Sequence, residues 1–565
     1  MANKYNLFYR KGAKPAKIIK QDLRKTRSSR VCDPAASSDK HGDHRPPLSN
    51  KRSFRVSPIK KKSKKNSGGC SGLLDLLRDL PIFAVKRILL FSLLLTACAP
   101  RASTINIENM ITPLAPTAVP APTSGRPAFA PGELVDYIAQ NGDMLPALAA
   151  RFNTTVDQIM QANPIIPTDA TTMPVGFPMK IPIYYLPLWG TAYQSLPDQA
   201  FVNGPTQIGF STSAYVASTN GWLKEYRTYA GGKMRSGAEV VDYVATNYSV
   251  SPRFLLTVLE YQSGALTQPD IPSKKYMLGF PRTFYTTPYL QLVIAANTFN
   301  NGYYNWRAGN LTEFELLDQT IFRPDPWQNA ASVAIQYYFS RLYTGTEYYT
   351  SIGPDGLART YQALFGDPWL DTTTIIPGSL QQPLLRFPFL PDYIWSYTGG
   401  PHTGWGSGEP FAAIDFAPSS ETSGCYIAGN NQEVVAMADG LIVRSDIDGI
   451  IIDLDKDGDE RTGWVLFYLH TATQDRIQVG QEVKTGDFLG LPSCEGGSST
   501  GTHVHIARKY NGEWILASGP LAFHLENWVV QAGSEAYEGT LVRGPLVIKA
   551  CACGDATSQI KSEVP

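Results

Sequence analysis

The sequence predicts a multidomain chain with a small βααβ module, a mainly α-helical middle region and an all-β, antiparallel C-terminal domain. Its 565 residues are enough for about three or four domains of ordinary size. Two Pro-rich stretches separate segments of different pattern. Helical stripes dominate before residue 375, and short β runs separated by Gly and Asp turns dominate after residue 394.

The first 84 residues form a basic, low-complexity leader. Residues 1–70 carry 20 Lys and Arg against 4 Asp, a net charge of +16 in a chain whose total is +1. Because this charge is confined to the leader, it says nothing about the folded part, and we expect no nucleic-acid partner. A start codon assigned too far upstream, or a cytosolic tail that is later removed, would explain such a leader before a secretion signal.

Residues 85–98 have the pattern of a secretion signal. Lys86 and Arg87 precede the apolar run Ile88–Leu95, which is too short to span a bilayer. The "LTAC" that ends at Cys98 resembles the lipobox of bacterial lipoproteins, which implies cleavage before Cys98 and lipidation of its thiol. We therefore expect an extracytoplasmic protein of the cell envelope that is lipid-anchored to a membrane. An ordinary buried helix is the alternative.

A linker rich in Pro, Ala and Thr, residues 99–132, leads to a small module at residues 133–184. Within the module, Leu145, Leu148 and Phe152 form the apolar stripe of a first helix, a Thr pair can cap a second helix, and "GFPMKIPI" reads as a closing strand. These residues resemble a LysM module, with Gly-Asp-Met in place of the more usual Gly-Asp-Thr. The resemblance implies binding to N-acetylglucosamine glycans, chiefly those of peptidoglycan.

The middle region, residues 200–375, reads as mostly helix. One helix begins with Ser251 as its cap and Pro252 at its first position. It faintly resembles the catalytic helix of lysozyme-like lytic transglycosylases, in which a Glu-Ser pair supplies the general acid. Gln262 stands at the position of the acid and cannot donate a proton as a carboxylic acid does. Glu260 lies nearly on the opposite face of the helix, so we expect a spacer or a degenerate glycan-binding fold here.

A second Pro-rich linker, residues 376–394, precedes the β domain at residues 395–545. Five of the seven histidines fall within this domain: His402, His470, His503, His505 and His524. Two of them are only one residue apart in "GTHVHIARKY". Residues i and i+2 of a strand share a face, so His503 and His505 could converge on a metal ion. A solvated histidine pair on a strand is the alternative.

Two further residues fit a metal site. Asp415 follows His402 by thirteen residues in an apolar stretch, where a carboxylate is costly unless it is paired or bound to metal. His470 ends the apolar run "WVLFYLH". Histidine and carboxylate ligands suit Zn²⁺, and three protein ligands leave the fourth position for water. The sequence therefore predicts a zinc site in the β domain.

The order His402…Asp415, then Tyr-x-His ending at His470, then Gly-Thr-His-x-His ending at His505, resembles the lysostaphin/LytM-type zinc endopeptidases of bacterial cell walls. The thirteen-residue spacing and the "GGPH" around His402 resemble their β-lytic branch. The resemblance implies that His402, Asp415 and His505 are the zinc ligands. It places His470 and His503 beside the metal-bound water and the scissile carbonyl. No HExxH glutamate is present, so one of these two histidines must take the proton or stabilise the oxyanion.

This resemblance predicts a zinc metalloendopeptidase that cleaves peptide bonds in the stem or cross-bridge peptides of peptidoglycan. The alternative is a non-catalytic protein of the same fold that binds peptidoglycan and activates a separate cell-wall amidase. Inert relatives usually lack one or more site residues, and this sequence keeps all five. His524 matches no position of the motif.

Export would make disulfides possible. We expect Cys425 to pair with Cys494, and the "CAC" at residues 551–553 has no clear role. The stretch Asp453–Trp464 has the Asp-x-Asp-x-Asp-Gly spacing of the first half of a calcium loop, but Trp464 stands where the bidentate Glu is needed. A hairpin turn is the simpler explanation.

Overall fold

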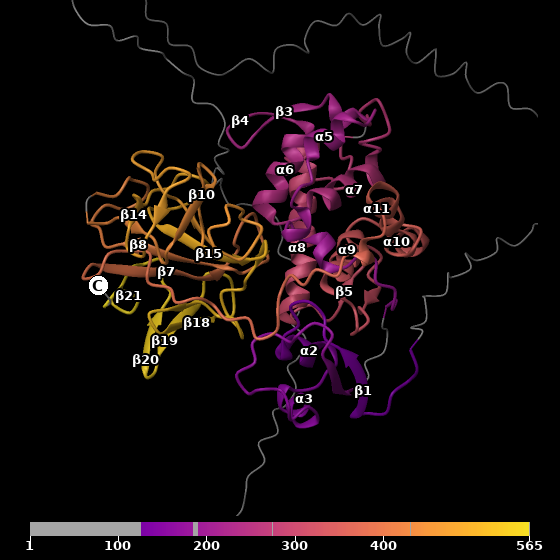
Figure 1. Cartoon of the computed structure of the whole chain (residues 1–565), viewed down its shortest axis with the longest axis horizontal. Coiled ribbons are helices and arrows are strands. Elements are labelled where there is room, and N and C mark those ends of the chain that lie inside the picture. Colours follow the sequence, from indigo (N-terminus) through magenta and orange to yellow (C-terminus); the bar gives the residue numbers. More distant parts are fainter. Residues whose placement is uncertain (1–125, 185–189, 274, 430, 564–565) are drawn as a thin grey trace, which may run out of the picture. The chain divides into compact units, whose positions relative to one another are not determined.

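The structure is a computed structural model, and the residues that it describes are 126–184, 190–273, 275–429 and 431–563 (Figure 1). The predicted leader at 1–84, the predicted signal at 85–98 with Cys98, and most of the linker at 99–132 lie outside the described residues and stay predictions. Within the described ranges, no helix combines the length and the apolar character needed to cross a membrane.

The first unit has the predicted βααβ order. Its elements are β1 (Glu133–Ile138), α2 (Leu145–Arg151), α3 (Val156–Ala162) and β2 (Pro178–Ile183). β1 and β2 pair antiparallel, and the apolar stripe of α2 is buried in the core of the unit. Thr155 and Gln158 form a capping box at the start of α3. In the turn before α2, the buried Asp143 carboxylate accepts hydrogen bonds from the hydroxyl of Tyr137 and the guanidinium of Arg151.

The middle region is mainly helical, as predicted. Its helices are α4 (Asp198–Phe201), α5 (Thr212–Ala217), α6 (Gly237–Tyr248), α7 (Pro252–Ser263), α8 (Pro288–Ala308), α9 (Ala330–Ser340), α10 (Gly345–Ile352) and α11 (Leu357–Phe365). Two short hairpins, β3 (Arg227–Ala230) with β4 (Lys233–Ser236) and β5 (Phe314–Glu315) with β6 (Ile321–Phe322), join them. α7 begins as the sequence predicts, because the Ser251 hydroxyl accepts from the Phe254 N–H and Pro252 occupies the first helical position.

The C-terminal domain is a β domain, and all of the strand pairings described in it are antiparallel. Its strands are β7 (Ile394–His402), β8 (Ala413–Pro418), β9 (Val434–Val435), β10 (Gly440–Asp446), β11 (Gly449–Asp453), β12 (Trp464–Leu469), β13 (Glu482–Val483), β14 (Phe488–Gly490), β15 (Val504–Tyr510), β16 (Glu513–Trp514), β17 (His524–Leu525), β18 (Trp528–Ala532), β19 (Gly539–Arg543), β20 (Leu546–Lys549) and β21 (Gln559–Lys561). The main sheet has the order β13-β10-β11-β12-β15-β8-β7-β21, with β16 beside β15. A smaller sheet has the order β17-β18-β19-β20, and β14 pairs with β9.

The two faces of the main sheet contribute to different hydrophobic cores. Phe467 of β12 and Ala507 of β15 belong to the cluster that includes the buried side chains of the helical region. Their neighbours Tyr468 and Ile506 belong to a second cluster inside the β domain. Because side chains alternate along a strand, His505, two residues before Ala507, lies on the face that packs against the helical region. The predicted metal site therefore lies on the face of the sheet that packs against the helices.

Candidate metal centre

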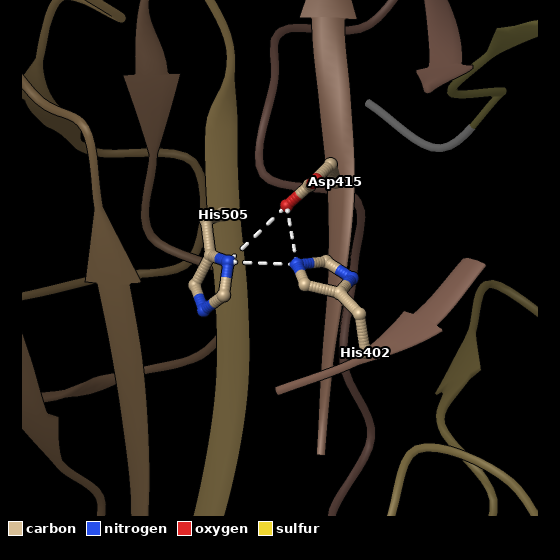
Figure 2. Close-up of side chains that lie close together, drawn as sticks. All are labelled: His402, Asp415 and His505. Carbon is tan, nitrogen blue, oxygen red and sulfur yellow. Dashed lines mark hydrogen bonds and ion pairs between the residues drawn. The ribbon is translucent and has the colours of Figure 1, made fainter. Parts of the chain in front are cut away.

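Three of the predicted site residues come together on neighbouring strands. His402 ends β7, Asp415 lies in β8, and His505 lies directly opposite Asp415 in β15. The Nε2 atom of His402 is 3.2 Å from Oδ1 of Asp415 and 3.0 Å from Nδ1 of His505. The same Oδ1 atom is 3.2 Å from Nδ1 of His505. Figure 2 shows the three atoms facing one another in a triangle.

The donor set fits a divalent metal ion. Ligand atoms about 2.1 Å from a tetrahedral ion are about 3.4 Å apart, close to the spacing of this triangle. All three residues are buried, and the Asp415 Oδ1 atom accepts no well-aligned hydrogen bond in the described structure, with only the imidazole nitrogens beside it. A buried carboxylate oxygen is costly unless a proton or a cation on those nitrogens compensates it. A cation within the triangle would satisfy that oxygen and both ring nitrogens at once.

Backbone carbonyls fix how the two ligand imidazoles are presented. The Nδ1 atom of His402 lies 2.8 Å from the carbonyl oxygen of Gly400. The Nε2 atom of His505 lies 3.2 Å from the carbonyl oxygen of Gly404. Each carbonyl accepts a hydrogen bond from the ring N–H that points away from the triangle, so the other nitrogen turns its lone pair inward. Such outer contacts orient metal ligands and set their tautomers.

The charges in this triangle favour a proton on His402, at the place where a metal cation could bind. Burial opposes the charged form of His402, but the adjacent Asp415 outweighs it and raises the pKa of this histidine. Burial likewise opposes ionisation of Asp415, yet His402 and His503 hold the pKa of this carboxyl well below its usual value. Burial, reinforced by His402, lowers the pKa of His505. A metal ion would displace the proton of His402, because metal ligands must be deprotonated.

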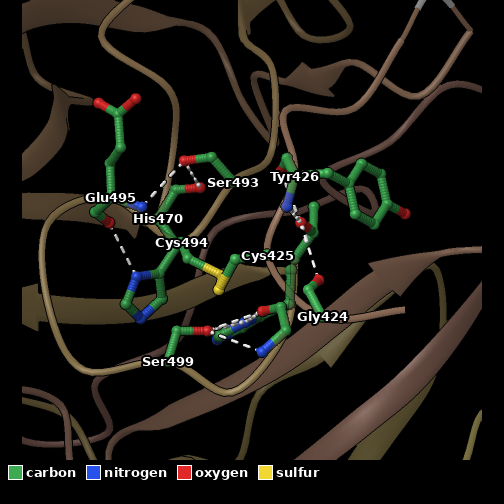
Figure 3. Close-up of a disulfide and its surroundings, with 11 residues drawn as sticks. Gly424, Cys425, Tyr426, His470, Ser493, Cys494, Glu495 and Ser499 are labelled. Atoms are coloured by element: carbon green, nitrogen blue, oxygen red, sulfur yellow. Dashed lines mark hydrogen bonds between the residues drawn. A yellow bond between two sulfur atoms is a disulfide. The ribbon is translucent and has the colours of Figure 1, made fainter. Parts of the chain in front are cut away.

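The other two predicted histidines lie beside the triangle. The rings of His470 and His503 are 4.5 Å apart between centroids. Nδ1 of His470 is 2.9 Å from the carbonyl oxygen of Glu495 (Figure 3). Nδ1 of His503 is 2.8 Å from the carbonyl oxygen of Gly501. Both rings therefore leave Nε2 free, and that of His503 is 3.7 Å from Asp415 Oδ1. Burial, together with the neighbouring histidines, lowers the pKa of His470 to about 3, so its ring is neutral at neutral pH.

A disulfide braces the turn that carries His503. Cys425 and Cys494 are bonded, which is the pairing expected from the sequence (Figure 3). The N–H of Thr502 donates to the carbonyl of Gly424, 3.0 Å away, next to this disulfide. The segment immediately before His503 is thus tied to a loop distant in sequence.

In the structure, Glu260 and Gln262 of α7 make structural hydrogen bonds. The Glu260 carboxylate accepts hydrogen bonds from the Leu266 N–H at 2.7 Å and the Thr267 hydroxyl at 2.6 Å, closing the turn after α7. Gln262 accepts a 2.6 Å hydrogen bond from the Tyr338 hydroxyl inside the helical region. His524 lies exposed on β17, and it is not a member of the His402, Asp415 and His505 group.

The acidic stretch between β11 and β12 forms a hairpin turn. Asp453, Asp455 and Asp457 bring carboxylate oxygens close together. The Asp453 carboxylate, however, accepts from the N–H groups of Asp455 at 3.2 Å and Gly458 at 2.9 Å, as expected of a turn. Trp464, in the position of the missing glutamate, begins β12.

Sequence reasoning missed two features near the site. The ring of Tyr537, 56% exposed, stacks on His402 with centroids 4.1 Å apart, and its backbone pairs with Gly400 and Pro401. No motif marks Tyr537, because the contact spans more than 130 residues of sequence. A second disulfide joins Cys551 and Cys553, next to the edge of β7.

Three segments of the chain match models of known protein families. Residues 137–182 match the family model described as LysM domain, residues 194–378 match "LasA, N-terminal domain", and residues 420–516 match "Peptidase family M23". The last segment includes His470, His503 and His505 but begins after His402 and Asp415, which the structure adds to the same site.

Individual known proteins are similar to parts of the chain. The chain is 27% identical to Protease LasA of Pseudomonas aeruginosa over 352 residues, covering 57% of this chain and 75% of that protein. It is 28% identical to Beta-lytic metalloendopeptidase of Achromobacter lyticus over 163 residues, covering 27% of this chain and 40% of that protein. Among solved structures, the M23 metalloprotease pseudoalterin is 25% identical, with a TM-score of 0.25, covering 30% of this chain and 96% of that one.

Proposed function

We propose that this chain, an M23-type peptidase that carries a LysM domain, is a zinc endopeptidase that hydrolyses peptide bonds of peptidoglycan. The observation that carries the proposal is the buried triangle of His402, Asp415 and His505, with two further histidines beside it. Three protein ligands are the number typical of catalytic zinc, because a fourth position stays open.

His402 Nε2, Asp415 Oδ1 and His505 Nδ1 would hold the ion. When bound, zinc supplies Lewis acidity toward a carbonyl and acidifies water toward a pKa of about 7. One carboxylate and two neutral imidazoles leave a net charge near +1 at the centre, which favours a developing oxyanion.

His470 and His503 would handle the proton and the carbonyl oxygen. Each is anchored through Nδ1 to a backbone carbonyl, which would leave Nε2 available to a bound substrate. A neutral ring of this kind can accept a proton from water and then pass it to the leaving amine. A ring that also carries a proton on Nε2, as an imidazolium, can instead donate to the oxyanion. One of the two histidines would then transfer the proton while the other stabilises the oxyanion.

The LysM domain would hold the enzyme on its polymeric substrate, peptidoglycan. It would bind the N-acetylglucosamine-containing glycan while the β domain cuts the attached stem or cross-bridge peptides. Lipidation at Cys98 would place the enzyme at a membrane of the cell envelope, with residues 99–132 as the tether. Mass spectrometry of the mature N-terminus tests this localisation, and an intact Met1 in the mature protein would contradict it.

All five site residues are present and converge, which favours hydrolysis over a scaffold that activates an amidase. The test is the release of free amines from purified peptidoglycan, together with zinc analysis of the protein. We expect one zinc per chain, amine release that stops on chelation, and loss of both metal and activity in Asp415→Ala. If zinc-loaded wild type releases no amines from any wall type, the scaffold function replaces this proposal.

A further inference from the structure

The segment between the first two proposed ligands is held by a helix of another domain. We define residues 403–412, which join β7 to β8, as the inter-ligand loop. Within it, the Gly404 N–H donates to the Pro410 carbonyl at 2.9 Å, which closes the loop on itself. The Gly404 carbonyl oxygen is the group that faces Nε2 of His505, 3.2 Å away. The position of this loop therefore sets the orientation of a proposed metal ligand.

Two asparagines of α8 bind the backbone of the inter-ligand loop. The Asn297 Oδ1 atom accepts a 2.8 Å hydrogen bond from the Ser407 N–H. The Asn301 Oδ1 atom accepts a 2.8 Å hydrogen bond from the Glu409 N–H. The two asparagines are four residues apart, so they lie on one face of the helix. The Asn297 Nδ2 group donates to the Val293 carbonyl at 3.1 Å, which turns Oδ1 outward toward the loop.

The loop backbone is shaped to accept these two amides. Gly406 and Gly408 have φ values of +86° and +82°, in the left-handed region that favours glycine. A Cβ at Gly406 would lie 2.5 Å from the Asn297 Oδ1 atom, and a Cβ at Gly408 would lie 2.2 Å from that of Asn301. Only glycine lets the backbone come this close to the helix at both points.

Aromatic contacts make a second connection between the loop and the metal site. Trp405 of the loop lies edge-on to Phe467, with ring centroids 6.1 Å apart. Phe467 in turn lies edge-on to His505, at 5.9 Å. Movement of the loop would therefore disturb both the hydrogen bond to His505 and the packing behind its ring.

We propose that Asn297 and Asn301 are positioning residues for the metal centre, and that they act through the inter-ligand loop to hold the Gly404 carbonyl against His505. The Nδ1 lone pair of His505 then stays aimed at the ion, so metal affinity depends on a helix of the middle region. The inference rests on the proposed function only in requiring that the triangle holds a metal. By this inference, the helical region contributes to metal binding through α8.

The test measures metal binding in the full-length protein, apart from any activity. Zinc affinity is obtained by competition with a chromophoric chelator, and ligand geometry from the visible absorption of the Co²⁺-substituted protein. Loss of an outer contact to a ligand typically weakens metal binding by about 10–100-fold. We expect Asn297→Ala with Asn301→Ala to bind zinc at least about 10-fold more weakly and to shift the Co²⁺ bands.

Asn305→Ala is the matched control. Asn305 lies one turn further along α8, and its side chain donates to the Asn301 carbonyl of the same helix. We expect wild-type zinc affinity and Co²⁺ bands from this variant. If the double variant does not fold, Gly406→Ala, which pushes the loop away from Asn297, must show the same weakening in its place.

The outcomes separate this inference from the proposed function. A folded double variant with wild-type zinc affinity and Co²⁺ bands would show that the asparagines only join the domains, and would overturn the inference. A wild type that binds zinc without cleaving peptidoglycan contradicts the proposed function alone. A wild type that binds no metal contradicts both.

Discussion

Glu409 of the inter-ligand loop should make the protein less stable at alkaline pH. Glu409 is only 7% exposed, and its carboxylate accepts a 2.7 Å hydrogen bond from the Phe411 N–H. Burial raises the pKa of this carboxyl from 4.5 to about 7, against the smaller opposing effect of that hydrogen bond. The perturbation that tests this is Glu409→Gln, which keeps the accepting oxygen and removes the charge.

The direction and size of the effect follow from the raised pKa. Well below pH 4.5 the folded and unfolded states are both largely protonated at Glu409, and at pH 4.5 itself the penalty is only about 0.4 kcal/mol because half of the unfolded chains keep the proton. As the pH rises from 4.5 through about 7, the unfolded state releases its proton first, so folding loses stability. The difference between a pKa of about 7 and 4.5 corresponds to about 3 kcal/mol when it is fully expressed above pH 8. Glu409→Gln should therefore be about 3 kcal/mol more stable than wild type at pH 8.5, and about equal to it near pH 4.5.

The assay is urea denaturation of both proteins at the two pH values, with a chelator present so that metal binding does not contribute. Glu421→Gln, at an exposed glutamate, is the control and should match wild type at both values. A stabilisation by Glu409→Gln that is the same at pH 4.5 and 8.5 would refute the reasoning, because it would show that Glu409 titrates alike in the folded and unfolded chain.

Two further predictions concern the other parts of the chain. The LysM domain alone, residues 133–184, should sediment with insoluble peptidoglycan and should still do so after an amidase has removed the stem peptides; loss of binding to the stripped glycan would mean that it recognises something else. Replacing Cys425 and Cys494 by Ser should lower the free energy of unfolding by up to about 4 kcal/mol, since this disulfide closes a loop with a sequence separation of 69. Equal unfolding midpoints for this variant and wild type in denaturant would contradict that estimate.

Local patterns in the sequence marked some residues of the site, whereas the choice of His402, Asp415 and His505 as ligands came from the resemblance to the lysostaphin/LytM-type endopeptidases. His503 and His505 are two residues apart, and in a strand this spacing places both side chains on the same face. Asp415 stands out as a carboxylate in an apolar strand, and the structure places it directly opposite His505. The small module was predictable for the same reason, since the stripe of α2 and the capping box at Thr155 are encoded by near neighbours.

The supporting contacts were not predictable, because they join positions remote in sequence. The Gly404 carbonyl carries no side-chain signal at all, yet it faces His505. Asn297 and Asn301 read as ordinary polar positions on a helix, and only the folded chain shows that they meet the inter-ligand loop. The helices of the middle region could likewise be predicted from the sequence. The sequence did not indicate that these helices share a hydrophobic core with one face of the β sheet.

In the proposed centre, one histidine of the "HVH" pair would hold the ion while the other would act on the substrate. The most direct measurement compares zinc content and amine release from peptidoglycan for wild type, His503→Ala and His505→Ala. We expect His503→Ala to keep its zinc and to lose about 10²–10⁴-fold in rate, as is typical when a general base or an oxyanion donor is removed. His505→Ala, on the same strand face, should lose both zinc and activity. Cleavage by His503→Ala at the wild-type rate, or full zinc occupancy in His505→Ala, would contradict the account.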